Sequence, residues 1–552
     1  MIFLRTIVRS ELSLFILYFC RVNKLQKSFI LFFLVSTTFF GLNNNAFGQK
    51  TVIHIEKARV ANYDKRLGAD VQRLIGNVVL RQDSTLFYCD SAYLNDRLKN
   101  FEAFSNVHIN FNDSLDIYSR RLKYEGETRI AELFDSVRMI DKTMLLETNY
   151  LIYNRNTKMA SYPDKGTITS QDKILKSKKG YYQTDKKEFY FREDVELISP
   201  DNTAYSDTLV YNTELETAWF HGPTVIRGKD NTIYCEYGWY DTKKDHAHLS
   251  RRAKIWSEEQ MLESDQLFYD RDIGFGDAKG NVLISDTTNN MLISGDVGKM
   301  WELEGRSFVT GKALARNYDE KDTLFMHADT LFLTFSKKEK QAHDLYAYKH
   351  VKFFRKDMQG KCDSLVYRMS DSAMRMYVEP VLWSEKNQLT ADSIMIAISK
   401  NSVDSLVMYN TAFIVSHDSI ENYNQIKGKN MTGYFVKNEL KSIYVDGNAQ
   451  TVYWVREEDK TLIGTNLAQS STMLIRLTEN EIESITYRSN PNEVMYPEKE
   501  LPKDSSRLKG FRWLSEWRPE SKADIFVIGP KEIVKPLEEA QKPVMMEDEP
   551  EE

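Results

Sequence analysis

The sequence predicts an all-β fold, an elongated solenoid of about 13 similar units stacked as two facing sheets. Two short phrases recur along the chain, one of the form Gly-Asn-Val-x-Leu and one of the form Ser-Asp-x-Leu-x-Tyr. Self-similarity with a period of about 31 residues is typical of a solenoid. Apolar residues alternate with polar ones inside each phrase, which indicates half-buried strands rather than helices.

The first phrase marks each unit by its central apolar residue. Clear copies lie at 76–80, 105–109 and 280–284. The markers are Val78, Val107, Val137, Ile168, Val195, Val225, Ala253, Val282, Ala313, Val351, Val381, Ala412 and Ala449. Asn, Asp, Ser and Lys between the apolar runs are typical of turns.

The second phrase begins with a small residue, and this position explains the cysteines. Clear copies lie at 206–211 and 264–269, whereas Cys89, Cys235 and Cys362 fill the Ser or Ala position of other copies. These copies are several units apart, too far for a disulfide within one rigid body. We therefore interpret the three as small buried side chains, with intermolecular disulfides as the alternative.

Stacking is required because a single unit of three or four strands cannot bury its apolar face alone. The stacked units, expected over residues 49–475, would enclose a continuous apolar interior between two sheets, in a body on the order of 100 Å long. The sequence leaves open whether this interior is an open groove or a packed core.

The chain begins with a segment that is typical of secretion. An apolar run at 29–41 follows basic residues and precedes Ala46-Phe47-Gly48, which predicts a signal peptide over 1–48, cut after Gly48. An earlier apolar run at 12–20 suggests the hypothesis of a translation start at Val22. A retained membrane anchor is the alternative, but the second run is short for a span.

Beyond about residue 490 the repeats fade. Residues 476–530 are expected to cap the last unit or to dock a partner, with Leu508–Trp517 as the most apolar part. Residues 531–552 are rich in Pro and Glu, and we expect a disordered acidic tail there.

Catalytic and metal-binding motifs are sparse. We find no nucleophile elbow, zinc-protease motif, phosphate-binding glycine loop or Cys-x-x-Cys pair. His246 and His248 would share one strand face, as a metal site requires, but we favour a polar turn. The recurring Asp of the second phrase is replaced elsewhere by Lys178, Glu236 and Arg120, so it is interpreted as a turn or edge residue and not as a metal ligand.

The aromatic position that ends the second phrase has two readings. Stacked rings on adjacent strands are ordinary sheet stabilisation, which we favour for any single residue. The column as a whole also fits an aromatic-lined trough for acyl chains. Its members are Tyr124, Tyr153, Tyr182, Tyr211, Tyr240, Tyr269 and Tyr367.

The two phrases, repeated behind a signal peptide, resemble the OstA-like family, which includes the lipopolysaccharide-transport protein LptA and the N-terminal domain of LptD. The resemblance covers about residues 50–475. It implies an antiparallel β-jellyroll of two facing sheets, open along one edge, that carries lipopolysaccharide across the periplasm with the lipid A acyl chains between the sheets. It also implies no enzyme activity and no cofactor. The chain is much longer than one LptA-type unit, so we expect it to do alone what an oligomer does elsewhere.

The sequence therefore predicts a periplasmic protein that binds and carries or bridges lipopolysaccharide, and it leaves outer-membrane association open. Expected partners are lipopolysaccharide and other transport proteins joined by edge-strand addition, with membrane contact only through them and, at a net charge of −6, no nucleic acid. The rivals are an adhesive or structural scaffold and, less favoured because charge is spread over all units, a β-helix polysaccharide-degrading enzyme. The predicted lipid-contacting interior residues are Val78, Leu80, Val107, Ile109, Val137, Val195, Leu197, Val225, Leu267, Tyr269, Val282 and Ile284.

Overall fold

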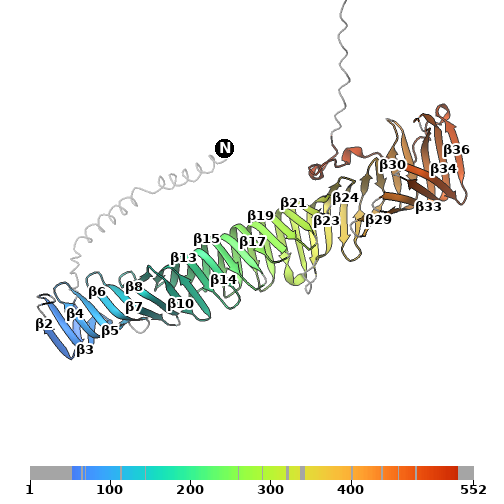
Figure 1. Cartoon of the computed structure of the whole chain (residues 1–552). Coiled ribbons are helices and arrows are strands. Elements are labelled where there is room, and N and C mark those ends of the chain that lie inside the picture. The colour runs from blue at the N-terminus through green and yellow to red at the C-terminus, as the bar shows by residue number, and fades with distance from the viewer. Residues whose placement is uncertain are drawn as a thin grey trace, which may run out of the picture.

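The protein is a long rod of antiparallel strands, which confirms the predicted all-β, two-sheet fold (Figure 1). The computed structural model describes residues 52–531, apart from short interruptions at 64–65, 67, 69, 112–114, 143, 230, 259, 289, 319–321, 336–341, 400–401, 420, 437–438, 458, 460 and 479–480. The predicted signal peptide and acidic tail lie outside the described residues, the latter except for Lys531. Among the described residues the only helices are single 3₁₀ turns: η1 (Glu302–Glu304), η2 (Glu498–Glu500), η3 (Ser515–Trp517) and η4 (Asp524–Phe526).

Most strands are long and are joined as hairpins. The long strands are β3 (Val71–Gln82), β4 (Thr85–Asn95), β5 (Asn100–Phe111), β6 (Leu115–Glu125), β7 (Ile130–Asp141), β8 (Met144–Asn154), β13 (Glu188–Ile198), β14 (Thr203–Asn212), β15 (Thr217–Arg227), β16 (Thr232–Asp241), β17 (His246–Trp256), β18 (Gln260–Asp270), β19 (Phe275–Asp286), β20 (Met291–Trp301), β21 (Arg306–Tyr318), β22 (Thr323–Phe335), β23 (Ala342–Arg355), β24 (Met358–Arg368), β33 (Glu439–Arg456) and β34 (Leu462–Thr478).

Other strands are shorter, because the chain breaks between the two sheets or lies at an end of the rod. They are β1 (His54–Lys57), β2 (Val60–Tyr63), β9 (Met159–Tyr162), β10 (Gly166–Ser170), β11 (Lys173–Ser177), β12 (Lys179–Gln183), β25 (Ala373–Tyr377), β26 (Val381–Ser384), β27 (Asn387–Thr390), β28 (Ser393–Ser399), β29 (Ser402–Tyr409), β30 (Phe413–His417), β31 (Tyr423–Lys427), β32 (Asn430–Val436), β35 (Glu481–Arg488) and β36 (Asn492–Pro497).

Each long strand passes through both sheets and bends at a β-bulge between them. In the β4–β5 pair, Thr85–Tyr88 pair with residues 108–111, the register then shifts, and Ser91–Asn95 pair with residues 100–104. The same shift recurs in the successive long-strand pairs β13–β14, β18–β19 and β23–β24. We call this line of bends the corner, and the opposite side, where the hairpin loops of the two sheets face each other, the mouth.

The first sequence phrase is the corner itself. Its two residues before the apolar marker adopt left-handed conformations, with φ of 61° at Ser105 and 47° at Asn106, and 75° at Gly280 and 49° at Asn281. Gly and Asn tolerate this region better than other residues, which is why they recur there. A bulge increases local bending, so each phrase turns the strand from one sheet into the other.

The recurring Asp of the second phrase stabilises the corner. Asn106 Nδ2 donates to Asp90 Oδ2 at 2.8 Å, and Asn281 Nδ2 donates to Asp265 Oδ2 at 2.9 Å. Where the Asp is replaced by Lys178, the corner residue opposite is Asp194, and the two form an ion pair of 2.6 Å. The prediction of a turn or strand-edge residue is thus corrected: in these copies the residue pairs with a corner residue of the next strand.

Two predicted markers are displaced from the inner face. On β15 the residue after the corner is Thr224, which is fully buried with Ile226, whereas Val225 between them faces the outer side of its sheet. On β26, Leu382 pairs with Gly360 on the inner face, so Val381 lies on the outer face. Pro follows Gly222 and Glu379 at these corners, and this obscured the phrase.

The C-terminal part of the chain returns along the rod. Strands continue to Pro497, since β35 and β36 each pair with β34. Residues 501–531, which we call the return segment, then run back over the outer face of one sheet as far as β22 and β23. Figure 1 shows this segment, in red, beside β24 rather than over the β36 end.

Candidate functional site

Most of the predicted interior residues lie between the two sheets. Nine are at most 2% exposed: Val78, Leu80, Val107, Ile109, Val137, Val195, Leu197, Leu267 and Val282. Tyr269 and Ile284 are half-buried. Val225 is the exception, because it faces outward. Contact of these residues with lipid stays a prediction.

The interior is divided into two cores of different character. The N-terminal half, with core residues from Ile53 to Val282, contains ten buried aromatic side chains: Phe87, Phe101, Tyr124, Tyr153, Tyr162, Tyr182, Phe189, Phe191, Tyr211 and Phe220. Among the described residues, the core between the sheets of the C-terminal half, from Ile293 to Ile475, contains one, Phe353. It contains instead seven buried methionines: Met326, Met358, Met374, Met376, Met408, Met431 and Met473.

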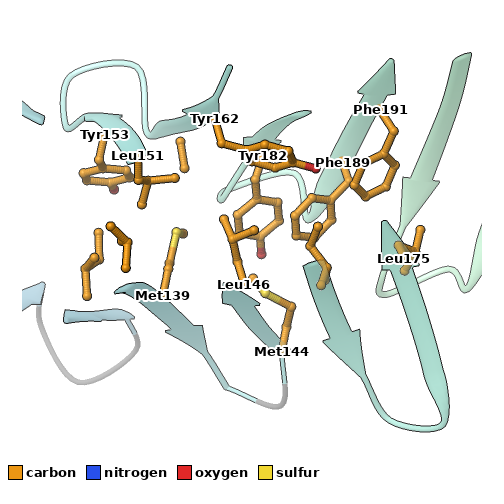
Figure 2. Close-up of a cluster of buried hydrophobic side chains, with 14 of the residues drawn as sticks. Met139, Met144, Leu146, Leu151, Tyr153, Tyr162, Leu175, Tyr182, Phe189 and Phe191 are labelled. Carbon is orange, nitrogen blue, oxygen red and sulfur yellow. The ribbon is translucent and has the colours of Figure 1, made fainter. Parts of the chain in front are cut away.

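Aromatic rings fill the N-terminal half. The rings of Tyr182 and Phe189 stack at 4.1 Å, and those of Phe189 and Phe191 at 5.4 Å. Figure 2 shows these rings between the strands, with Leu146, Met144 and Tyr162 closing the space around them. Contacts of this kind are those of a packed core.

Two glycines show how tightly this core is filled. A Cβ atom at Gly166 or at Gly180 would overlap the ring of Tyr162. The Tyr162 hydroxyl lies 2.7 Å from Ser177 Oγ, which fixes the ring across the interior. A methyl group therefore has no room at these positions.

The mouth of the N-terminal half is bridged by polar contacts between hairpin ends of the two sheets. Gln82 Nε2 donates to the Gly126 carbonyl at 3.0 Å, and Arg155 contacts Asp83 at 3.0 Å. Further along, Lys187 pairs with the buried Asp141 at 2.6 Å. These bridges join the edges of the two sheets along the mouth.

The tyrosine column adds to this closure. The Tyr182 hydroxyl donates to Asp141 at 2.7 Å, and that of Tyr124 donates to Gln82 Oε1. Further along, the Tyr269 hydroxyl donates to Glu302 at 2.8 Å, but this contact joins hairpin ends of the same sheet. Burial raises the pKa of Tyr124 to about 12, so its phenol keeps its proton. In this half the column is part of the packed core and of its polar closure.

The C-terminal half has room in its interior. A cavity of about 350 Å³, here the middle cavity, is lined from one sheet by Met291, Ala315 and Met326 and from the other by Leu345, Tyr367 and Met374. A second cavity of about 560 Å³, the C-terminal cavity, begins at Met358 and reaches β35. Its apolar lining includes Leu382, Ile396, Leu406, Ile414, Phe435, Ile443 and Ile475. Arg355, which pairs with Asp357 at 2.6 Å, borders both cavities.

The residue type at the tyrosine position of the repeat changes between the two halves. Five residues after the small residue, the chain has Tyr in six consecutive units up to Tyr269, but Met300, Leu333 and Ile396 in later ones. Tyr367 interrupts this series and lines the middle cavity. Sequence reasoning treated the column as uniform and so missed the boundary.

The other candidate residues have structural partners. Cys89, Cys235 and Cys362 are buried and free, as predicted, and burial raises the pKa of each thiol to about 12. His246 opens strand β17 and lies 3.1 Å from Asp270, whereas His248 stacks on Trp239. Over the described residues no group of three His, Cys, Asp or Glu side chains is placed to hold a metal ion.

The return segment covers the outer wall of the cavities. Gln388, fully buried on β27, donates to the Arg512 carbonyl at 2.8 Å and accepts from the Leu514 amide at 2.7 Å. Gln425 on β31 binds the Ser506 carbonyl and the Leu508 amide in the same way, both at 2.8 Å. The two glutamines are two strands apart in the sheet, and the segment advances six residues between them.

A six-residue repeat in the return segment matches this spacing. Leu508 and Leu514, Phe511 and Trp517, and Arg512 and Arg518 are each six residues apart. Arg518 Nε donates to Gln359 on β24 at 2.8 Å, which extends the row of glutamines. Residues 501–531 therefore form a third layer behind one sheet and do not cap the last unit, whereas docking of a partner by this segment stays a prediction.

No helix in the portion of the chain that the structure describes is long and apolar enough to cross a membrane.

Comparison with known proteins gives matches to parts of the chain. No curated protein matches it. Among solved structures, LptH from Pseudomonas aeruginosa, the LptA-homologous periplasmic component of the lipopolysaccharide transport device, is similar at 14% identity and a TM-score of 0.19, covering 25% of this chain and 95% of that chain. Residues 50–207 match the family model described as OstA-like protein, and residues 292–402 match that of the LptA/(LptD N-terminal domain) LPS transport protein. The chain thus carries an OstA-like segment in its N-terminal half and an LptA/LptD-type segment in its C-terminal half, which confirms the predicted family resemblance.

Proposed function

We propose that this chain is a periplasmic lipopolysaccharide-transport protein that holds lipid A acyl chains between its two sheets. The observation that carries the proposal is the pair of apolar cavities between the sheets, of about 350 and 560 Å³. Ligand pockets usually measure about 300–1,000 Å³ and are lined mainly by apolar side chains. Each buried CH₂ group contributes about 0.8 kcal/mol, so an acyl chain is a favourable occupant.

The family matches support this reading, since both describe the OstA or LPS-transport type. The chemistry of the site supports carriage rather than catalysis. The charged groups described above are engaged in pairs at the corner or the mouth, and apolar side chains such as Leu406, Ile443 and Ile475 line the C-terminal cavity together with polar residues. The stack of strands ends at β1 on one side and at β36 on the other. We propose that neighbouring transport proteins add strands at these edges.

Photo-crosslinking in cells tests the proposal. The aryl azide p-azidophenylalanine would replace Tyr367, which lines the middle cavity, and in a matched control Tyr348, which is 44% exposed on the outer face of the same sheet. Illumination should join lipopolysaccharide to the first variant and not to the second. Absence of any adduct at Tyr367 and at every other tested position between the sheets, in variants with normal melting behaviour, would overturn the proposal.

A further inference from the structure

We infer that lipid acyl chains occupy only the C-terminal half of the interior, from about β20 onward, and that the N-terminal half is a closed spacer. This inference rests on the proposed function and narrows it to one part of the rod. It reassigns the inner-face residues that were predicted to contact lipid, from Val78 to Val282, to a structural core. It also gives the lipid a defined place of entry and exit, which is the mouth of the C-terminal half.

Available space is the first argument. The N-terminal interior has no room for a methyl group at Gly166 or Gly180, and its rings stack at distances as short as 4.1 Å. In the C-terminal half, the middle and C-terminal cavities, of about 350 and 560 Å³, lie between the two sheets. To admit a chain, the N-terminal half would have to expel side chains that already fill it, whereas the cavities need no such rearrangement.

The nature of the lining is the second argument. Methionine is unbranched and flexible, and its polarisable thioether adapts to ligands of varied shape. Met326 and Met374 line the middle cavity from opposite sheets, and Met358 lines the C-terminal cavity. Such walls suit several acyl chains of unequal length better than stacked rings do.

Access is the third argument. At the mouth of the N-terminal half, contacts such as Gln82 to Gly126 and Lys187 to Asp141 tie the two sheets together. The middle cavity reaches the mouth of the C-terminal half, because the hairpin residues Asn317 and Asp322 are part of its lining. The mouth is therefore closed to lipid along the N-terminal half, whereas in the C-terminal half a cavity reaches the mouth.

The boundary between the halves is sharp in the chain. Ile284 packs on both cores, and Met300 replaces the tyrosine of the preceding units. The transition thus falls within β19 and β20.

The experiment compares crosslinker positions that are matched in chemistry. The azide p-azidophenylalanine replaces one aromatic residue at a time in the full chain: Tyr153 or Tyr182 in the N-terminal half, and Tyr367 or Phe435 in the C-terminal half. Tyr182 and Tyr367 occupy the same position of the repeat, so they differ mainly in which half they occupy. Two positions per half preserve the comparison if one variant fails to fold, and thermal melting identifies such a variant.

We expect lipopolysaccharide adducts at Tyr367 and Phe435 to exceed those at Tyr153 and Tyr182 by at least tenfold. Equal adducts in both halves would overturn the inference and leave the proposed function standing. Adducts confined to the N-terminal half would overturn it as well. Absence of adducts at all four positions would overturn both.

Discussion

The row of glutamines formed by Gln359, Gln388 and Gln425 binds the return segment, and we predict that it keeps this segment on the sheet. Gln388→Met keeps the length and volume of the side chain but removes both polar atoms. In the wild-type protein Gln388 binds the Arg512 carbonyl at 2.8 Å and the Leu514 amide at 2.7 Å. In the variant both backbone groups lose this buried partner. An orphaned buried polar group costs about 1–3 kcal/mol, so the two together cost about 2–6 kcal/mol if the segment stays in place.

The return segment can avoid this cost by detaching, because water then satisfies its backbone. We therefore expect Gln388→Met to release residues 506–518 locally and to leave the sheets folded. At the lower limit of about 2 kcal/mol, amide hydrogen exchange in this segment should become roughly 30-fold faster. Hydrogen exchange with mass spectrometry measures this change directly.

The matched control is Gln469→Met, since Gln469 is exposed on β34 and its two polar atoms meet solvent. It should leave exchange in the return segment unchanged. If Gln388→Met also left the exchange of residues 506–518 at the wild-type rate, the glutamines would not be what holds the segment, and the reasoning would be refuted.

Three further predictions concern buried residues along the rod. Gly180→Ala forces a methyl group into the ring of Tyr162 and should destabilise the protein by about 1–3 kcal/mol in urea unfolding, whereas Gly529→Ala, with open space around it, should have no effect. Burial holds the pKa of Tyr124 near 12 against its ordinary 10.0, so the folded protein keeps a proton that the unfolded chain releases; the free energy of unfolding should fall as the pH rises above 10, and less steeply in Tyr124→Phe. The buried thiols, with their pKa near 12, should resist iodoacetamide in the native protein and react on unfolding; rapid native labelling would contradict their burial.

The strand pattern was predictable because alternation of apolar and polar residues is imposed by the pleat itself. The same holds for the two phrases, since the corner needs residues that tolerate positive φ and a small residue opposite them. Val225 shows the limit of this reasoning. With Pro223 in the phrase, a one-residue slip exchanged the inner and outer faces.

The distinction between a packed core and a cavity was not predictable from the repeat. Val107 on the N-terminal side and Ala315 on the C-terminal side obey the same alternation, yet only the second borders a cavity. Whether a space is filled depends on side chains that meet across the two sheets, which are distant in sequence. The end of the tyrosine series after Tyr269 was the available signal.

The return segment was also beyond sequence reasoning. Its six-residue repeat is visible in Leu508 and Leu514, but it acquires meaning only against Gln388 and Gln425, about a hundred residues earlier. No strand or helix periodicity marks such a segment. Its place is fixed by a match between two spacings, one in the segment and one across the sheet.

Analysis of lipid that accompanies the purified protein tests the central claim most directly. The full-length protein would be isolated gently from the cell envelope, and its fatty acids would be quantified beside those of Ala315→Phe, which fills the middle cavity from an inner-face position. We predict that the wild-type protein retains lipopolysaccharide acyl chains and that the variant, with unchanged melting temperature, retains at least several-fold less. A wild-type protein free of lipopolysaccharide, or equal retention by the two proteins, would contradict the account.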